Sequence, residues 1–169
     1  DSTFENSENF TLTATYANGG AKSATGTAAI KDDGTGTKFT SGNPTGNDPT
    51  TITDNTNLDD DRQLTVNNIT VNEGNGSNYA VFSVGTVAGQ TLNLTLADGT
   101  AVRTGSGDTL DFGSTLQYWN GSAWTNYSAG FTVPGTANAN TTVLVRVLLN
   151  ADSTFENSEN FTLTATYAN

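Results

Sequence analysis

The chain has 169 residues, and it contains no cysteine, no histidine and no methionine. The length suits one domain of ordinary size. Without histidine and cysteine, the sequence excludes the usual zinc sites, thiol nucleophiles, Ser-His-Asp relays and structural disulfides. A formal net charge of −11 disfavours nucleic acid and anionic lipid as partners, because both require a basic face that displaces counterions. We therefore expect no nucleic-acid partner, no membrane insertion, cationic partners and chemistry carried by oxygen ligands.

The same eighteen residues, DSTFENSENFTLTATYAN, occupy positions 1–18 and again positions 152–169. An identical segment that returns after 151 residues indicates a tandem array of domain-sized units (152 against 1). Neighbouring units of the same array are therefore expected partners.

The repeat also predicts that the ends of the 169-residue chain do not coincide with the domain boundaries of the array. Residues 1–33 are predicted to be the C-terminal strands of the preceding unit. Residues 34–63, rich in Thr, Gly, Asn and Asp, are predicted to be an inter-unit linker. Residues 64–169 are predicted to be a β-sandwich unit that lacks its last strand, which a copy of residues 19–33 would complete.

Alternating apolar and polar residues, β-branched and aromatic residues, and flanking Gly, Asn or Asp predict a series of short strands. In chain order these are residues 10–16, 25–30, 64–71, 79–84, 92–96, 115–119, 131–133, 143–149 and 161–167. An extra hairpin is predicted at 119–131, around the Asn120-Gly121 turn. No segment has a helical period, so we expect an all-β, antiparallel, immunoglobulin-like Greek-key β-sandwich.

The strand predicted at 161–167 would have an open edge in this segment of the array. We expect residues 25–30 to fill that edge, either from the same chain or from a neighbouring molecule in a head-to-tail row.

Most of the acidic side chains lie in the predicted loops. If the strands run alternately up and down, the loops that carry most of these acids meet at one pole of the sandwich. The acids placed there are Glu73, Asp98, Asp108, Asp111, Asp152, Glu156, Glu159, Asp32 and Asp33, and the first copy of the repeat carries the corresponding Asp1, Glu5 and Glu8. Carboxylates in such proximity repel one another unless a hard cation lies among them. Calcium is the expected cation, because it accepts six to eight oxygen ligands in flexible geometry. The alternative is a solvated acidic surface that maintains solubility.

Three consecutive aspartates, Asp59, Asp60 and Asp61, end the predicted linker. They are consistent with a junction calcium ion that stiffens adjacent units, and equally with hydrated linker charge.

Several of these segments resemble the Calx-beta domain. They are Val71-Asn72-Glu73-Gly74, Gly99-Thr100-Ala101, residues 107–112, residues 152–161 and Ile30-Lys31-Asp32-Asp33. They look like the variant found in tandem in giant bacterial RTX adhesins, where such units are extender modules. The resemblance implies the calcium ligands Glu73, Asp152, Glu156, Glu159, Asp32 and Asp33, with Asp108 or Asp111 as the aspartate of the loop between the third and fourth strands. It also implies a secreted protein at the bacterial cell surface, in agreement with an acidic, cysteine-free composition.

Two other functions compete with this one. The aromatic residues Tyr118, Trp119, Trp124 and Tyr127 around the predicted hairpin could form a platform for sugar rings, or could simply pack across the strands. Glycoside hydrolysis needs two carboxylates that face each other across a cleft. The sequence outlines no cleft, so we expect no enzyme. The predicted function is a calcium-stabilised extender repeat that projects a distal ligand-binding domain, with a glycan-binding β-sandwich module as the alternative.

Overall fold

The computed structural model describes residues 3–17, 22–39, 55–74, 76–104, 110–152 and 154–168. These residues form ten strands and no helix, and all paired strands are antiparallel. None of the described segments is a helix of the length and apolarity needed to cross a membrane. The chain divides into two compact units, Asp1–Arg62 and Gln63–Asn169. The predicted all-β, antiparallel class is therefore confirmed.

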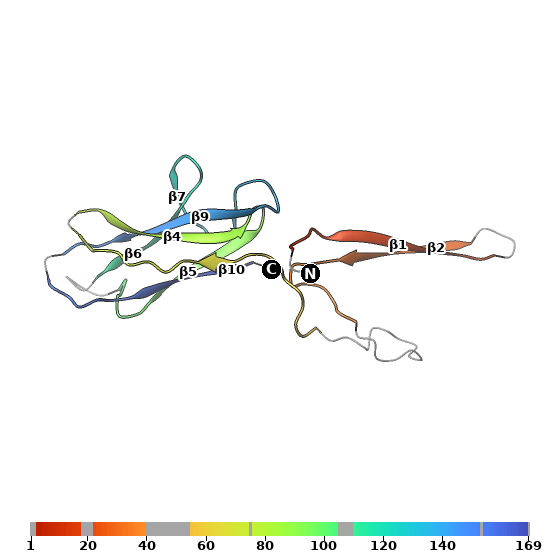
Figure 1. Ribbon diagram of the computed structural model, residues 1–169, viewed down its shortest axis with the longest axis horizontal. Coiled ribbons are helices and arrows are strands. Elements are labelled where there is room, and N and C mark those ends of the chain that lie inside the picture. The colour runs from red at the N-terminus through yellow and green to blue at the C-terminus, as the bar shows by residue number, and fades with distance from the viewer. Residues whose placement is uncertain are drawn as a thin grey trace. The chain divides into compact units, whose positions relative to one another are not determined.

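The first unit contains an antiparallel hairpin of β1 (Glu8–Thr15) and β2 (Ser23–Ile30) (Figure 1). Glu8 pairs with Ile30 at one end of the ladder and Thr15 with Ser23 at the other. Every residue of both strands is exposed, so backbone hydrogen bonds hold this hairpin together with little burial of apolar side chains. Two-stranded ribbons of this kind are marginally stable in water.

The segments that follow β2 and precede the second unit are joined to each other. Asp33 and Asp60 form an isolated β-bridge, and the Gly34 N–H donates to the Asp59 carbonyl at 2.8 Å. The guanidinium of Arg62 is buried, and its terminal nitrogen donates to the Asp33 carbonyl at 2.8 Å. The described residues of this region are therefore held by a compact set of polar contacts.

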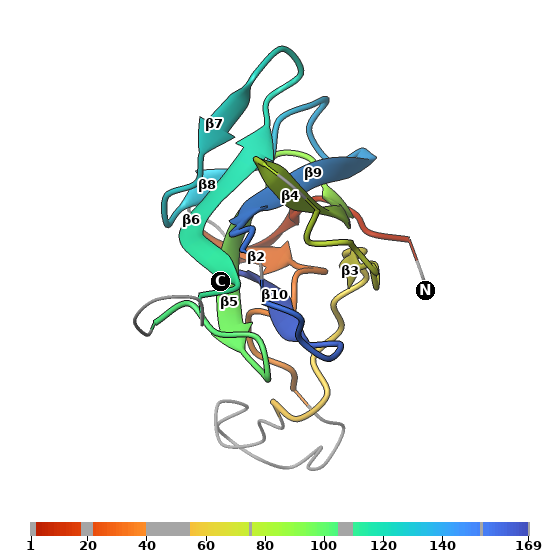
Figure 2. The same ribbon diagram turned by 90° about the vertical axis from the view of Figure 1, so that its left-hand side faces the viewer.

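The second unit contains two sheets. One has the strand order β3-β4-β9-β6-β7, and the other has the order β10-β5-β8. Figure 2 shows β4, β6 and β9 in one layer and β5 and β10 in the other. The strands are β3 (Thr65–Val66), β4 (Asn78–Val87), β5 (Thr91–Asp98), β6 (Phe112–Trp119), β7 (Trp124–Asn126), β8 (Phe131–Thr132), β9 (Asn140–Leu149) and β10 (Phe161–Tyr167). Two antiparallel layers are consistent with a β-sandwich.

The core lies between these layers because alternate side chains of each strand point inward. Along β9, for example, Val143, Val145 and Val147 are buried while the residues between them are more exposed. On the opposite layer, the ring of Phe161 stacks on Phe112 with centroids 4.1 Å apart. The inward face of β10 is therefore part of the core.

The first strand of the second unit is much shorter than the predicted 64–71. Its ladder with β4 covers Thr65 and Val66 only. At the next position the Asn67 side chain, instead of its backbone carbonyl, accepts the Ser83 N–H at 2.7 Å. An amide side chain that replaces a backbone acceptor in this way ends the regular ladder.

The predicted hairpin after residue 119 is present. β6 and β7 pair from Gln117–Asn126 to Trp119–Trp124. The Asn120 side-chain oxygen accepts the N–H groups of Ser122 and Ala123 at 2.9 Å each, and Gly121 has a φ of 100°. The Asn-Gly pair therefore supplies both the cap and the left-handed residue that this turn requires.

Candidate functional site

Two groups of three carboxylates stand out among the described residues. In each group, ligand oxygens from the three side chains lie within 4.8 Å of one another. The sandwich cluster consists of Asp111, Glu156 and Glu159 in the second unit. The linker cluster consists of Asp32, Asp59 and Asp61 in the first unit. Each unit therefore carries its own acidic group.

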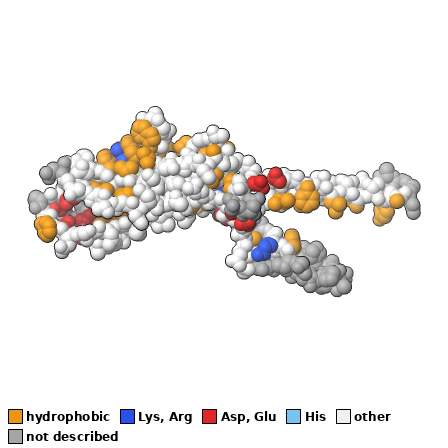
Figure 3. Space-filling model, viewed as in Figure 1, with side chains coloured by type: hydrophobic (Ala, Val, Ile, Leu, Met, Phe, Trp, Pro, Cys, Tyr) orange, Lys and Arg blue, Asp and Glu red, His pale blue; other side chains and the backbone are white. Residues whose placement is uncertain are grey.

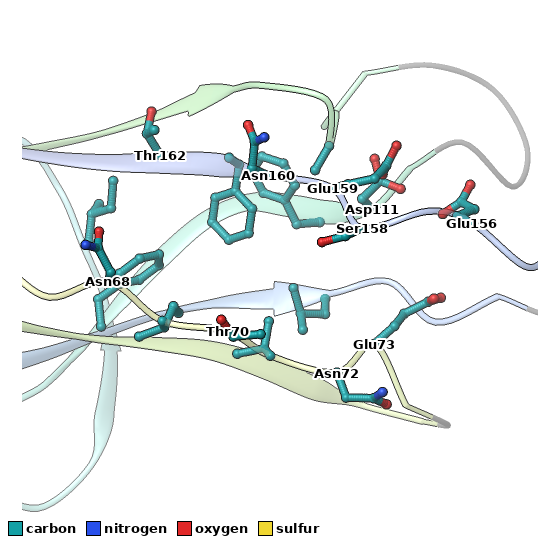
Figure 4. A pocket seen from close by; sticks show the side chains of 18 of the residues that line it. Asn68, Thr70, Asn72, Glu73, Asp111, Glu156, Ser158, Glu159, Asn160 and Thr162 are labelled. Atoms are coloured by element: carbon teal, nitrogen blue, oxygen red, sulfur yellow. The ribbon is translucent and has the colours of Figure 1, made fainter.

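The sandwich cluster is built from two loops. Asp111 precedes β6, where its carboxylate accepts the Val102 N–H at 2.6 Å and its carbonyl accepts the Asn150 N–H at 2.9 Å. These bonds fix Asp111 between the loop after β5 and the end of β9. Glu156 and Glu159 come from the loop that leads into β10, and Figure 4 shows Glu159 beside Asp111. Figure 3 shows acidic side chains gathered at this end of the second unit.

Two more acids lie at the rim of the sandwich cluster. A Glu73 carboxylate oxygen accepts the Asp152 N–H at 2.7 Å, and Asp152 in turn accepts the Thr154 N–H at 2.6 Å. Glu73 comes from the segment between β3 and β4, which faces the β9–β10 loop in Figure 4. Carboxylates from three loops are thus brought to one end of the sandwich.

The charged forms of Glu156 and Glu159 are destabilised in the sandwich cluster. Partial loss of solvent raises the pKa of Glu156, and the negative charges of Asp111, Asp152, Glu159 and Glu73 raise it further. The pKa of Glu159 is raised by partial loss of solvent, by the charge of Asp111 and by a hydrogen bond with that residue. A cation among these oxygens would remove the repulsion.

A groove of about 860 Å³ runs from the sandwich cluster along β10. One wall is the segment 66–73 and the other is the segment 154–163, while Phe82, Phe112 and Leu149 are among the apolar residues that line it (Figure 4). The groove therefore combines an acidic end with an apolar interior.

The linker cluster contains a buried oxygen without a partner. Oδ2 of Asp61 is inaccessible to solvent and makes no hydrogen bond. Loss of solvent raises the pKa of Asp61, and the charges of Asp59 and Asp32 raise it further. Asp32 accepts the Glu5 N–H at 3.0 Å, so it is connected to the segment that precedes β1. An unpaired buried carboxylate oxygen is costly unless something positive satisfies it.

The aspartates next to the linker cluster have protein partners instead. Arg62 donates to both oxygens of Asp60 at 2.8 and 2.7 Å. This bidentate bond is the main cause that lowers the pKa of Asp60. Asp33 accepts from the hydroxyl and the N–H of Thr35, and the hydroxyl bond is the main cause that lowers its pKa. The carboxylates of Asp60 and Asp33 are thus engaged by side-chain and backbone donors of the chain itself, as structural acceptors.

The remaining predicted ligands are dispersed or outside the described residues. Asp98 forms an ion pair with Arg103 at 2.6 Å, which supplies it with a cation from its own loop. Glu8 lies on the exposed strand β1, and Glu5 contributes its backbone N–H to Asp32. Asp1 and Asp108 lie outside the described residues.

The aromatic hairpin is engaged in packing. Arg146 lies between two rings, 3.8 Å from the centroid of Tyr79 and 4.2 Å from that of Trp124. Trp119 and Trp124 meet at an interplanar angle of 64°, so they do not form a flat platform. The position of Arg146 in the middle of an apolar strand signals that it needs a partner, but no pattern in the sequence identifies these two rings.

Comparisons with family models, with curated proteins and with solved structures find no match to this chain.

Proposed function

We propose that this chain is a calcium-stabilised extender repeat of a bacterial cell-surface adhesin. Calcium would be held by the sandwich cluster with the rim acids Glu73 and Asp152, and the units would act as rigid spacers that project a distal ligand-binding domain. The observation that carries this proposal is the convergence of Asp111, Glu156 and Glu159, whose carboxylate oxygens lie within 4.8 Å of one another. The pKa values of Glu156 and Glu159 are raised there.

The chemistry of the donors favours calcium. All the ligands are carboxylate oxygens on loops of different origin, a combination that suits the flexible coordination of Ca²⁺ better than the strict octahedron of Mg²⁺. In the linker cluster, the unpaired Oδ2 of Asp61 is a buried acceptor that a cation would satisfy. Bound calcium would supply positive charge that offsets the repulsion among these side chains.

The strand order supports an immunoglobulin-like sandwich. The order β3-β4-β9-β6 corresponds to the A-B-E-D sheet of immunoglobulin domains, and the neighbours β5 and β10 correspond to strands C and F. In that arrangement strand G would pair with the open edge of β10. We propose this Greek-key assignment together with the Calx-beta-like resemblance of the loop sequences.

The repeated eighteen residues support the spacer role and the surface location. A unit that recurs after 151 residues fits a tandem array, in which stiffness arises from many equivalent modules. An acidic chain that becomes compact on binding calcium would stay loosely folded during export and become rigid outside the cell.

Thermal unfolding in calcium chloride and in chelator tests the proposal. We expect a clearly higher midpoint in calcium, since a ligand at a hundredfold excess over its dissociation constant stabilises the folded state by about 2.7 kcal/mol. Magnesium at the same concentration is the control, and we expect a much smaller shift. Equal midpoints in calcium and in chelator would contradict the proposal. A glycan-array screen would separately test the glycan-binding alternative.

A further inference from the structure

The outer edge of β10 carries backbone groups without a strand partner in the described part of the chain. β10 is the terminal strand of its sheet, and β5 is its only neighbour there. The Ala168 N–H donates to the Thr91 carbonyl, which places residue 168 in a hydrogen-bonded pair with the β5 side. Backbone groups alternate between the two sides of a strand, so those of Phe161, Leu163 and Ala165 point to the open edge.

The first copy of the repeat uses the same edge. In β1 the Tyr16 N–H donates to the Lys22 carbonyl on the β2 side. By the same alternation, Phe10, Leu12 and Ala14 direct their backbone groups toward β2. These three residues correspond in sequence to Phe161, Leu163 and Ala165. The edge that β10 leaves open is therefore the edge that its sequence twin uses to bind β2.

We propose that β2 of a second copy of this chain binds along the open edge of β10 as an added antiparallel strand. The register follows from the β1–β2 ladder, in which Phe10, Leu12 and Ala14 pair with Ala28, Gly26 and Ala24. In the complex, Phe161 pairs with Ala28, Leu163 with Gly26 and Ala165 with Ala24 of the second copy.

The groove beside β10 fits this strand. It lies between the segments 66–73 and 154–163, and apolar rings of the core line it. The face of β2 that would turn toward the core carries only small residues at Ala24, Gly26 and Ala28. In the β1–β2 hairpin, a Cβ at Gly26 would meet no atom within 4 Å, so the hairpin itself does not require a glycine there. Next to Leu163, over the packed core, a small residue has a clear advantage.

When β2 moves from β1 to β10 of a second copy, it keeps the same pattern of backbone hydrogen bonds and gains contact with a hydrophobic core. β1 and β10 have the same sequence, so β2 finds the same backbone partners on either strand. On β10 it would also lie beside Phe161 and the buried Leu163 at the edge of the core, instead of in solvent. β1, which is left without β2, loses little burial of apolar side chains, because Phe10 and Leu12 are already 57% and 74% exposed in the hairpin. Each copy then has one donor strand and one acceptor edge, which generates head-to-tail chains or closed rings.

Disulfide trapping tests the proposal and its register. The chain contains no cysteine, so each introduced thiol is unique. Thr13 and Thr25 face each other with hydroxyl oxygens 3.0 Å apart, and Thr164 is the counterpart of Thr13 in β10. One full-length protein carries Thr164→Cys, a second of different mass carries Thr25→Cys, and the two are mixed under mild oxidation. We expect the mixed disulfide dimer as the main cross-linked product, because directly opposed residues of a non-hydrogen-bonded pair meet disulfide geometry.

The control replaces Thr25→Cys with Ala24→Cys, whose side chain points to the other face of the strand. We expect at least tenfold less mixed dimer with this partner. Light scattering of the unmodified protein over a range of concentrations is the second readout, and we expect the mean mass to rise with concentration.

Three results would overturn the proposal. The first is equal trapping with Ala24→Cys, and the second is a monomer at all concentrations with no mixed dimer. The third is a disulfide-closed monomer from the double variant Thr25→Cys/Thr164→Cys, which would place the strand in the same chain. The inference does not depend on calcium, so the trapping is repeated in chelator. Trapping in calcium but not in chelator would support the strand addition and would indicate that the sandwich needs the ion to fold. Trapping in both conditions would support the strand addition without supporting a need for calcium.

Discussion

The chain contains one sequence in two environments. Leu12 on β1 is 74% exposed, whereas its twin Leu163 on β10 is 8% exposed. Tyr16 projects into solvent, whereas the hydroxyl of its twin Tyr167 donates to the Gln63 carbonyl at 2.6 Å. The alternating pattern therefore makes a strand in both places, and only the opposing sheet turns that strand into part of a core. Identical substitutions at twin positions separate these two contributions.

The largest difference is expected at the twin leucines. Leu163→Ala should lower the free energy of unfolding of the sandwich by about 2–5 kcal/mol, because it leaves a cavity in a buried layer. Leu12→Ala should change it by less than about 0.5 kcal/mol. Denaturant titration followed by tryptophan fluorescence measures the sandwich, since Trp119 and Trp124 both belong to the second unit. Equal effects at the two positions would contradict the difference in burial.

The twin glutamate pairs distinguish the calcium contribution. The double variant Glu156→Gln/Glu159→Gln should lose most of the calcium-induced stabilisation, about 2.7 kcal/mol at a hundredfold excess of ion. The same variant in chelator should unfold at a higher temperature than the parent, because neutral side chains escape both the loss of solvent and the repulsion that raise the pKa values of the two glutamates. The matched control is Glu5→Gln/Glu8→Gln, which should leave the calcium shift of the tryptophan signal unchanged.

The twin tyrosines should differ by a smaller amount. Tyr167→Phe removes the bond to the Gln63 carbonyl and the acceptor of the Val87 N–H at 3.2 Å. We expect a loss of about 1–3 kcal/mol, the usual cost of leaving a buried polar group such as the Val87 N–H unsatisfied. Tyr16→Phe should have no measurable effect. The midpoints of urea unfolding measure both variants, and a neutral Tyr167→Phe would show that water replaces the hydroxyl.

The smallest expected effect is a pH dependence in the presence of chelator. Because the pKa values of Glu156 and Glu159 are raised in the folded state, the native state binds more protons than the unfolded state in this range. The resulting stabilisation is fully present below the ordinary glutamate value of 4.5 and is lost as pH rises through the raised values. The melting temperature of the sandwich should therefore fall from pH 4.5 to pH 7 in chelator. Calcium should flatten this slope, and Glu156→Gln/Glu159→Gln should abolish it.

Much of the strand pattern could be predicted because the side-chain period of a strand is visible in the sequence. β1 and β10 follow from strict alternation, β2 follows from its β-branched residues and flanking turn residues, and the β6–β7 turn follows from Asn120-Gly121. The extent of β3 could not be predicted. The apolar pattern continues to Val71, but the side chain of Asn67 takes over the ladder bond after Val66. The end of β3 therefore depends on the side-chain conformation of Asn67 at a sheet edge. The apolar period of the sequence contains no information on that conformation.

Grouping of the acids could be predicted only in part. Parity of strand direction was sufficient to predict that Asp111, Glu156 and Glu159 gather at one end. It could not separate these acids from Asp98, which binds Arg103. In the predicted linker, the run Asp59–Asp61 likewise did not distinguish Asp60, which binds Arg62. Both arginines lie within five residues of their partners, but whether such a near neighbour turns back toward the carboxylate depends on the loop backbone.

The bridge between Asp33 and Asp60 closes the intervening chain into a loop. The length of that loop therefore need not affect the contacts that the bridge residues make. The backbone leaves β2, returns at Asp60 and is clamped there by Arg62. Insertions or deletions between residues 39 and 55 would therefore change the size of the loop that the bridge closes, at an entropic cost of about 0.6 kcal/mol for each doubling. This stretch can therefore diverge in length and composition while the contacts among Asp33, Asp60 and Arg62 stay the same.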